Sequence, residues 1–273
     1  MQGEAIGAYC LTETEAGSDV GSMHTTATAE GDDVVIDGEK VWITNGGVAD
    51  VLLVFASRDR NLKTKGIECF LVPADAPGVI REDMPGRELG HRASNHARIR
   101  FEGVRVPLTA RVGAPHGGYR AAMSGLDAGR LNVAAGAVGA HRACLEASVA
   151  FARDRRQFGK RIGDFQQVGA TLAEMDVSLR ASRLLVHHAA RLRDRGLDAR
   201  AAVSAAKLRA TEVAFEAARQ AIQLHGSRGY SDELPLERHL RDLIALTIYE
   251  GTSNIQRVIL SRFLLGRDEG ATR

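Results

Sequence analysis

The tetrapeptide Pro115-His116-Gly117-Gly118 divides the chain of 273 residues into two parts with different hydrophobic periods. Before it, short runs rich in β-branched and aromatic residues alternate with Gly, Asp, Asn and Pro, which is typical of strands and turns. After it, apolar residues recur every three, four or seven positions, as on one face of an amphipathic helix. The change of period predicts an α+β chain, with a β domain at residues 1–114 and a helical domain at residues 115–273.

The N-terminal part contains six short segments with strand-like composition, at residues 25–29, 34–36, 40–44, 51–57, 67–72 and 97–101. Residues 30–33 and 37–39 have the composition of tight turns between neighbouring strands. No helix long enough for a parallel crossover lies between these segments. We therefore expect an antiparallel sheet, closed into a barrel or a sandwich.

The C-terminal part predicts three long amphipathic helices, whose apolar stripes run through residues 126–151, 168–186 and 203–224. Connections are expected at residues 153–163 and 194–198. Two further helices, at about 235–248 and 254–265, flank Glu250. Together the five helices are expected to form an up-and-down helical bundle.

Glu250 occupies the short connection between the last two predicted helices. Catalytic groups are often found in such connections. Leu246 and Ile248 are apolar neighbours, and burial among them would raise the pKa of the carboxyl, as a base active near neutral pH requires. The alternative is that Glu250 only complements the dipole of the helix that follows it.

Arg130 interrupts the apolar stripe of the first long helix, four residues after Leu126 and three before Val133. A cation that starts from a packed face needs a partner. That partner could be an acidic residue of a neighbouring helix, or the guanidinium could extend to solvent. Four glycines of the same helix would let another element approach it closely: Gly125, Gly129, Gly136 and Gly139.

Two stretches of the β part carry groups suited to a planar polar ligand. Between Tyr9 and Asp19, Thr12 and Ser18 offer hydroxyls, and small residues leave backbone N–H groups open to a ring edge or an anion. In the stretch from Trp42 to Gly46, the chain's single tryptophan shares a strand face with a threonine two residues later and could stack on a flat ring. A core tryptophan that closes one end of a barrel is the alternative.

Composition and motifs exclude several classes of protein. A formal net charge of +2, with 26% charged residues of both signs interleaved, provides no basic surface for nucleic acid or membrane. The sequence has no Gly-x-Gly-x-x-Gly between a strand and a helix, P-loop, His-Glu-x-x-His, Cys-x-x-Cys or Gly-x-Ser-x-Gly. No metal site is expected, and His187, His188 and His225 are interpreted as surface or satisfied histidines.

The chain also shows no sign of export. The start, residues 1–6, has neither the basic nor the apolar region of a signal peptide, and the apolar run at residues 51–56 is too short to span a bilayer. Cys10, Cys69 and Cys144 are far apart and read as reduced cysteines. These features predict a cytoplasmic protein.

Six ordered motifs, taken together, resemble the acyl-CoA dehydrogenase family over nearly the whole chain. The family's Tyr-x-x-Thr-Glu-x-x-x-Gly-Ser-Asp segment stands at residues 9–19 and its Trp-Ile-Thr-Asn-Gly at residues 42–46. The third motif, Gly-x-Arg-x-Ser followed by Phe-x-x-Val-x-Val-Pro, stands at residues 90–94 and 101–107. Three further motifs follow: Arg-Arg-Gln-Phe-Gly-Lys at residues 155–160, Gln-Leu-His-Gly at 223–226 and Ile-Tyr-Glu-Gly-Thr at 248–252.

The resemblance implies a central β-barrel domain, a C-terminal helical bundle, FAD as the cofactor, and oxidation of an acyl-CoA thioester to the trans-2-enoyl-CoA, as in fatty acid β-oxidation. Glu250 matches the base that removes the α-proton while flavin N5 accepts the β-hydride. Some branches place the base just before the arginine of the first bundle helix, where this chain has Gly129. The substrate-binding residues that the resemblance implies are Ser18, Leu126, Asp127, Arg130, Tyr249 and Gly251. The cofactor-binding residues are Tyr9, Leu11, Thr12, Gly17, Ser18, Trp42, Ile43, Thr44, Arg155, Gln157, Phe158, Gln166, Gln223, Leu224, Gly226, Ser227, Thr252 and Asn254.

The resemblance further implies electron-transferring flavoprotein as the electron acceptor, and a homodimer or dimer of dimers whose adenosine and pyrophosphate site crosses a subunit boundary. Thr14 replaces a frequent proline, and Ser227 replaces a frequent glycine. Members usually begin with a helical domain of about 100 residues or more, and this chain begins almost at the barrel. Three alternatives are open: a fragment, a partner chain that supplies the domain, or a protein that has lost activity. A truncated non-catalytic subunit and an acyl-CoA oxidase-like enzyme are the alternative functions.

Overall fold

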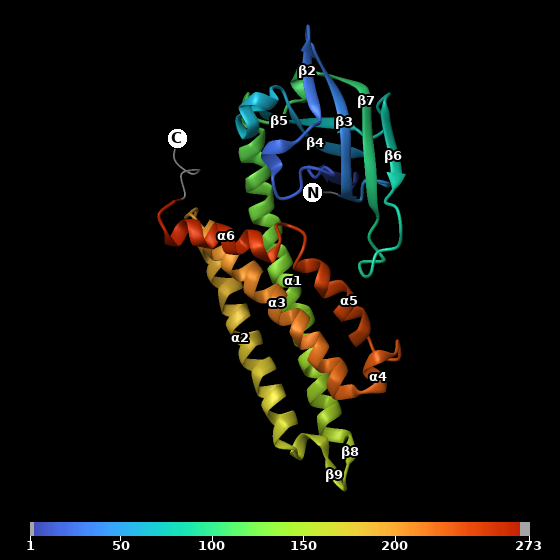
Figure 1. Ribbon diagram of the computed structural model, residues 1–273, viewed down its shortest axis with the longest axis vertical. Coiled ribbons are helices and arrows are strands. Elements are labelled where there is room, and N and C mark those ends of the chain that lie inside the picture. The colour runs from blue at the N-terminus through green and yellow to red at the C-terminus, as the bar shows by residue number, and fades with distance from the viewer. Residues whose placement is uncertain (1–2, 268–273) are drawn as a thin grey trace. The chain divides into compact units, whose positions relative to one another are not determined.

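The structure, a computed structural model, describes residues 3–267, which form two compact units (Figure 1). Residues 1–2 and 268–273, at the outer ends of the two predicted domains, lie outside the described range. The first unit comprises residues 3–88 and 92–125, and the second comprises residues 89–91 and 126–267. The division between the units falls inside a continuous helix, after Gly125.

In its described residues, the first unit contains one seven-stranded sheet with the order β1-β4-β2-β3-β7-β6 and with β5 paired to β4. The strands are β1 (Gly7–Cys10), β2 (Thr26–Glu30), β3 (Asp33–Thr44), β4 (Val51–Ser57), β5 (Ile67–Pro73), β6 (Val79–Asp83) and β7 (His96–Pro107). Most pairings are antiparallel, as predicted. The expectation of a purely antiparallel sheet is wrong, because β4 pairs in parallel with β1 and with the start of β2.

The two predicted turns have different outcomes. The turn at residues 30–33 is confirmed, since Gly31, with φ +63, joins β2 to β3 in a tight hairpin. The turn at residues 37–39 is wrong, because these residues lie inside β3, where the register against β7 shifts. A Cβ on Gly38 would lie 2.6 Å from the Thr25 Cα, so this glycine permits a close approach of two backbones.

Alternation along the strands buries one set of apolar side chains and exposes the other. Ile36, Leu52, Val54, Phe70 and Ile99 are at most 1% exposed and belong to one core. Side chains at the intervening positions point out of that core, because successive residues of a strand face opposite sides. Among the predicted cofactor residues of β3, Trp42 and Thr44 are therefore outside the core, whereas Ile43 is part of it.

The second unit is helical, with three long helices running side by side (Figure 1). The helices are α1 (Gly118–Asp154), which begins in the first unit, α2 (Gln166–Asp194), α3 (Arg200–His225), α4 (Ser227–Tyr230), α5 (Leu236–Leu246) and α6 (Ser253–Leu264). A hairpin of β8 (Arg156–Gln157) and β9 (Lys160–Arg161) joins α1 to α2. The α+β class and the predicted bundle are confirmed, with the short α4 and the hairpin as additions.

Small side chains allow these helices to pack closely. Ala206, Ala210, Ala214, Ala217 and Ala221 form a buried stripe along α3 and are at most 2% exposed. They pack in one core with residues of α1, α2 and α5. In the described part of the chain, no helix combines the length and the apolar character needed to cross a membrane.

The connection between α5 and α6 carries Glu250. The predicted helices at 235–248 and 254–265 are confirmed to within two residues at each end. The Thr252 side chain accepts a hydrogen bond from the Ile255 N–H at 3.2 Å and so caps α6. Glu250 is thus held in a loop of six residues between two helix ends.

Candidate functional site

Glu250 has an unusual backbone conformation for a residue with a side chain. Its φ is +56, and Gly251 follows with φ +85. A left-handed conformation costs a non-glycine residue about 1 kcal/mol or more, and such strain collects at functional sites. Surrounding contacts must therefore hold Glu250 in place.

Three side chains donate hydrogen bonds to the carbonyls of this loop. Arg130 Nε donates to the Glu250 carbonyl at 2.9 Å. Lys207 Nζ donates to the Gly251 carbonyl at 2.8 Å. Gln256 Nε2 lies 3.2 Å from the first carbonyl and 2.9 Å from the second. The N–H of Glu250, by contrast, donates no hydrogen bond within the described residues.

The Glu250 carboxyl group is sheltered but incompletely paired. Its Oε2 is buried and has no hydrogen-bond partner. Burial raises the pKa of Glu250 above its usual range, and the nearby charges of Arg130 and Lys207 oppose that rise. Of the two apolar neighbours expected to shelter the carboxyl group, Leu246 is 9% exposed and Ile248 is 60% exposed, so only Leu246 is buried.

Gly129 of α1 provides the space in which the carboxyl group lies. A Cβ at this position would be 2.6 Å from Glu250 Oε1 and 2.7 Å from Oε2. The glycine therefore lets the carboxyl group lie against α1 in its present position, and a larger residue would displace it.

Arg130 is only 6% exposed, so it does not extend to solvent. It pairs with Asp127, one turn earlier on its own helix, at 3.0 Å, and with the Glu250 carbonyl. The expectation of an acidic partner on a neighbouring helix is therefore wrong. Burial raises the pKa of Asp127, although Arg130 works against the rise. A role of either residue in substrate binding stays a prediction.

A groove of about 460 Å³ opens beside the loop. Asn132 and Val133 of α1 form part of one wall, and Leu243 and Leu246 of α5 form part of the other, with Tyr249 at the loop. The groove thus combines apolar walls with a few polar groups, which is typical of a small-molecule site.

His91 closes the groove from the segment at residues 89–91. Its N–H donates to Asp242 Oδ1 at 2.6 Å, and its ring lies edge-on to Tyr249 at 5.7 Å. A Cβ on Gly90 would lie 2.3 Å from the Arg241 carbonyl oxygen, so only glycine lets this segment approach α5. The Gly-x-Arg-x-Ser motif was the signal in the sequence that could have pointed to His91.

Trp42 is 54% exposed, so it is not a core residue that closes a barrel. Its φ of +58 lies at a register shift of β3. Thr44 is also exposed, whereas Val41 and Ile43 are buried. The indole and the threonine hydroxyl therefore lie on the open face of the strand, as a ligand that stacks on the ring would require.

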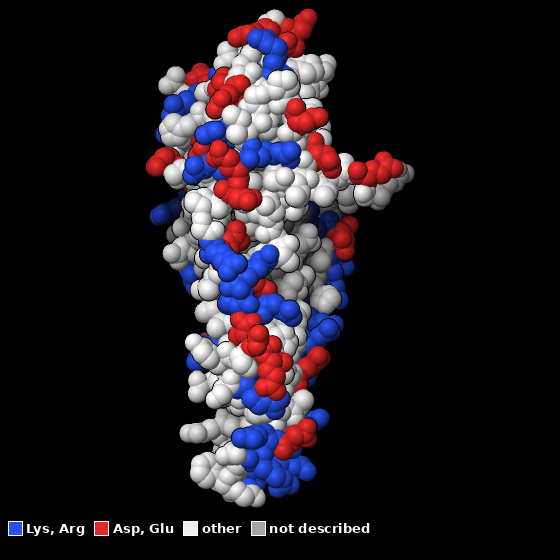
Figure 2. Space-filling view, turned by 90° about the vertical axis from the view of Figure 1, so that its right-hand side faces the viewer, with Lys and Arg blue, Asp and Glu red and all other residues white. Residues whose placement is uncertain are grey.

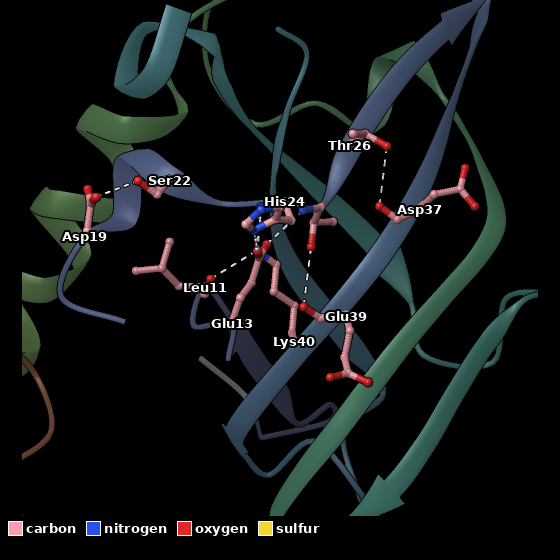
Figure 3. A network of polar contacts seen from close by, with 10 residues as sticks. Leu11, Glu13, Asp19, Ser22, His24, Thr26, Asp37, Glu39 and Lys40 are labelled. Carbon is pink, nitrogen blue, oxygen red and sulfur yellow. Dashed lines mark hydrogen bonds and ion pairs between the residues drawn. The ribbon is translucent and has the colours of Figure 1, made fainter. Parts of the chain in front are cut away.

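A buried ion pair fixes the segment of Thr12 against β3 (Figure 3). Lys40, which is fully buried, donates to the Leu11 carbonyl at 3.0 Å and to Glu13 Oε1 at 2.8 Å. Burial favours a raised pKa for Glu13, but the charge and hydrogen bond of Lys40 and the backbone N–H donors lower it overall. The Val41 N–H also donates to the Thr12 carbonyl at 2.9 Å. Thr12 is therefore held next to the strand that carries Trp42.

The predicted adenosine-binding residues lie around the lower end of the second unit in Figure 1. Phe158, at the tip of the β8–β9 hairpin, is 94% exposed and has φ +51. Gly226, with φ +60, makes the turn between α3 and α4. The Phe151 ring of α1 stacks on His225 at 4.3 Å, so the two helix ends are adjacent. Figure 2 shows basic side chains gathered near this end of the unit.

The structure thus brings some of the predicted site residues together and leaves others apart. One group of predicted residues is brought together at the loop between α5 and α6. The loop contains Tyr249, Glu250 and Gly251, and Arg130 of α1 bonds to it and to Asp127. Gln166 begins α2 and Asn254 lies in α6, both exposed, and their proposed contacts stay predictions. Lys207 and Gln256 were missed. Lys207 is far from the loop in sequence, and Gln256, although only six residues after Glu250, has no local pattern that shows its side chain turning back to the loop carbonyls. No cluster of three or more His, Cys, Asp or Glu side chains suitable for a metal is found in residues 3–267.

Two family models match the chain. The middle domain of acyl-CoA dehydrogenases matches residues 8–104, and the C-terminal domain of acyl-CoA dehydrogenases matches residues 116–265. The chain is 40% identical over 260 residues to the short-chain specific acyl-CoA dehydrogenase of Clostridium acetobutylicum, covering 95% of this chain and 68% of that protein. It is 42% identical over 266 residues to the mitochondrial short-chain specific acyl-CoA dehydrogenase of Bos taurus, covering 96% and 64%. The chain therefore spans about two thirds of the length of these relatives.

Solved structures have the same fold. Butyryl-CoA dehydrogenase from Megasphaera elsdenii superposes with a TM-score of 0.93 at 36% identity, over 96% of this chain and 68% of that one. A chain from the structural study of the electron transferring flavoprotein of Acidaminococcus fermentans, directed at flavin-based electron bifurcation, also has a TM-score of 0.93. It is 37% identical, over 96% of this chain and 69% of that one.

Proposed function

The chain belongs to the acyl-CoA dehydrogenase family, and from that premise we propose that it carries the catalytic machinery for FAD-dependent oxidation of an acyl-CoA thioester to the trans-2-enoyl-CoA. The observation that carries this proposal is the Glu250 carboxyl group. One of its oxygens is buried without a partner, and its pKa is raised by burial. We assign Glu250 as the base that removes the α-proton.

The chemistry explains why these features suit a base. The α-proton of a thioester is a very weak acid, so its removal needs a base whose pKa is matched to the task and a means of stabilising the enolate that forms. An unpaired carboxylate oxygen can accept the proton without first breaking a hydrogen bond. The free N–H of Glu250 can donate to the thioester oxygen as negative charge develops there.

Residues of the first unit fit the flat ring of a flavin. The half-exposed Trp42 offers a ring face for stacking, and the hydroxyls of Thr12, Ser18 and Thr44 offer polar partners for a ring edge. When bound, the flavin would supply the acceptor for the hydride, with its two electrons, that leaves the substrate Cβ, while the α-proton goes to Glu250. The chain's own part is to orient the substrate, shelter it from water and hold the base.

The adenosine half of FAD is assigned to residues near the β8–β9 hairpin and the α3–α4 turn, with Arg155, Gln157, Phe158, Gln223 and Gly226 as contacts. The exposure of the Phe158 ring supports a partner outside its own unit. We propose a homodimer in which this end of one subunit completes the cofactor site of the other. Electrons would leave through an electron-transferring flavoprotein.

The groove beside Tyr249 is proposed to take the acyl part of the substrate. Its apolar walls on α1 and α5 suit a hydrocarbon chain. Because the two curated relatives compared above are named short-chain specific, butyryl-CoA is the substrate to test first.

The test is anaerobic reduction of the FAD-loaded protein by acyl-CoA thioesters of graded chain length, followed by flavin absorbance. Wild-type protein should bleach fastest with butyryl-CoA. The Glu250→Gln variant should retain its flavin and lose about 10²–10⁴-fold in rate. Glu216→Gln, which removes a carboxylate from a surface ion pair on α3, is the matched control and should react like wild type.

Three results would contradict the proposal or its parts. Protein that takes up no FAD would refute the cofactor. Unchanged bleaching in Glu250→Gln would refute the base. Rapid reoxidation of the reduced protein by oxygen alone would favour the oxidase-like alternative over the dehydrogenase.

A further inference from the structure

A fully buried lysine of α3 points its ammonium group at the Glu250 loop. Lys207 is 0% exposed, and within residues 3–267 its only hydrogen bond is to the Gly251 carbonyl, at 2.8 Å. Among the carboxylates that the structure describes, none lies within salt-bridge distance of its ammonium group. A buried ammonium without a paired carboxylate is costly, so its presence here calls for a role.

Gln256 reaches the same carbonyl from the other side. It is also 0% exposed and projects from the first turns of α6. Its Nε2 lies 2.9 Å from the Gly251 oxygen and 3.2 Å from the Glu250 oxygen. Two successive carbonyls of the loop are therefore held by donors from two different helices.

We propose that Lys207 and Gln256 are positioning residues that hold Glu250 in its left-handed conformation with the carboxyl group directed into the space at Gly129. This inference rests on the proposed function of Glu250 as the base. It adds to that function the hydrogen bonds that keep the base in position between α5 and α6.

The backbone geometry explains why such a device is needed. A non-glycine residue at φ +56 is strained, and the loop would relax if its carbonyls were free to turn. Rotation of the peptide between Glu250 and Gly251 would break the bonds that Arg130 and Gln256 donate to the Glu250 carbonyl. Rotation of the next peptide would break the bonds that Lys207 and Gln256 donate to the Gly251 carbonyl. A carboxylate that shifts by 1 Å is no longer aligned with the substrate α-carbon, which is enough to slow a reaction about 10²-fold.

Lys207 has a second effect that Gln256 lacks. Its charge favours the ionised form of Glu250 and so opposes the rise in pKa that burial causes. Burial and the nearby Arg130 lower the pKa of Lys207 to about 8, while Glu250 and Glu212 raise it. Lys207 is therefore mostly charged at neutral pH, and removing that charge should raise the pKa of Glu250.

The experiment compares Lys207→Met and Gln256→Met, which keep side-chain length and remove the donors, with Thr211→Val. Thr211 is a buried residue of α3 whose hydroxyl bonds only to backbone of its own helix, so Thr211→Val controls for a buried change on α3. Hydrogen–deuterium exchange of residues 247–256 is measured in the purified FAD-loaded proteins. Steady-state oxidation of butyryl-CoA is then measured from pH 5.5 to pH 9.

Both methionine variants should exchange at least about 10-fold faster in residues 247–256 than wild type, and Thr211→Val should not. Both should lose about 10- to 100-fold in kcat with KM changed by less than about 3-fold. In Lys207→Met the acid limb of the kcat profile should move up by about one pH unit. In Gln256→Met that limb should stay in place, because no charge is removed.

Unchanged exchange in both variants would overturn the proposed contacts as the device that holds the loop. Faster exchange with wild-type kcat would overturn the positioning role. If Lys207→Met does not fold, Gln256→Met decides both points on its own. Wild-type protein that oxidises no thioester would instead refute the proposed function, and exchange in the loop would still report on the contacts.

Discussion

Gly129→Ala tests where the base lies, because it should affect activity and stability in opposite ways. The new Cβ would lie 2.6 Å from Glu250 Oε1, about 0.8 Å short of the 3.4 Å at which ordinary van der Waals contact begins. The carboxyl group is the end of a flexible side chain, so it can move away. The variant should fold, with its base displaced by most of an ångström.

The size of each effect follows from this geometry. Displacement of a reacting group by about 1 Å can cost up to about 10²-fold in rate, so kcat for butyryl-CoA should fall about 10- to 100-fold. Alanine is favoured over glycine inside a helix by about 0.5–1 kcal/mol. The free energy of unfolding should therefore stay within about 1 kcal/mol of the wild-type value.

Stopped-flow reduction of the bound flavin and urea denaturation measure the two effects separately. Gly139→Ala is the matched control, since no atom lies within 4 Å of a Cβ at that position of α1. It should gain stability and keep its activity. A Gly129→Ala variant whose rate of flavin reduction stays within about 3-fold of wild type would refute the placement of the working carboxylate beside α1.

Three further predictions concern the cofactor face, the buried ion pair and a buried histidine. Trp42→Ala should weaken FAD binding by about 2- to 10-fold through lost stacking, measured by flavin fluorescence titration, and a wild-type affinity would remove Trp42 from the cofactor site. Lys40→Met should lower the free energy of unfolding by about 3–5 kcal/mol, because Glu13 then keeps a buried charge without its cation. Urea denaturation measures this loss, and the double variant Glu13→Gln/Lys40→Met should recover part of it. No recovery in the double variant would contradict the pairing. His141 is 1% exposed, and burial lowers its pKa, although the nearby Met175 backbone opposes that shift. His141 therefore binds a proton more readily in the unfolded protein than in the folded one. Its contribution to stability is full above a pH of about 6.5 and falls as the pH drops below that value. The His141→Gln variant should lose less stability than wild type between pH 7.5 and pH 5.5, and an equal loss would exclude His141 as the cause.

Local periodicity was sufficient to predict most of the secondary structure. A period of two marks strands and a period of 3.6 marks helices, and both depend only on neighbouring residues. The change of period after residue 118 therefore located the start of α1, and the apolar stripes located α2 and α3. The prediction of a turn at residues 37–39 was wrong because Gly38 packs against the backbone of Thr25, and no local sequence pattern indicates that contact.

Only part of the candidate site could be predicted, because a local pattern does not show which distant segments meet. Glu250, Arg130 and Trp42 stand in motifs that can be read along the chain, and each could be named with a chemical role before any coordinates. The parallel pairing of β1 with β4 could not, because it joins strands separated by more than 40 residues and depends on how the sheet curls. Motifs indicate which groups are present but not which other segments meet them.

By itself, then, the sequence determined the fold class and the family resemblance, and it indicated Glu250 as the candidate base. Tertiary structure alone decided that this carboxylate has an unpaired oxygen, that Gly129 leaves room for it, and that Lys207 and Gln256 hold its loop. The physical reason is distance along the chain. Propensity and periodicity act over a few residues, whereas Gly129, Arg130 and Lys207 lie 121, 120 and 43 positions before Glu250 and are adjacent to its loop only after folding. Gln256 is the exception, six positions away in α6.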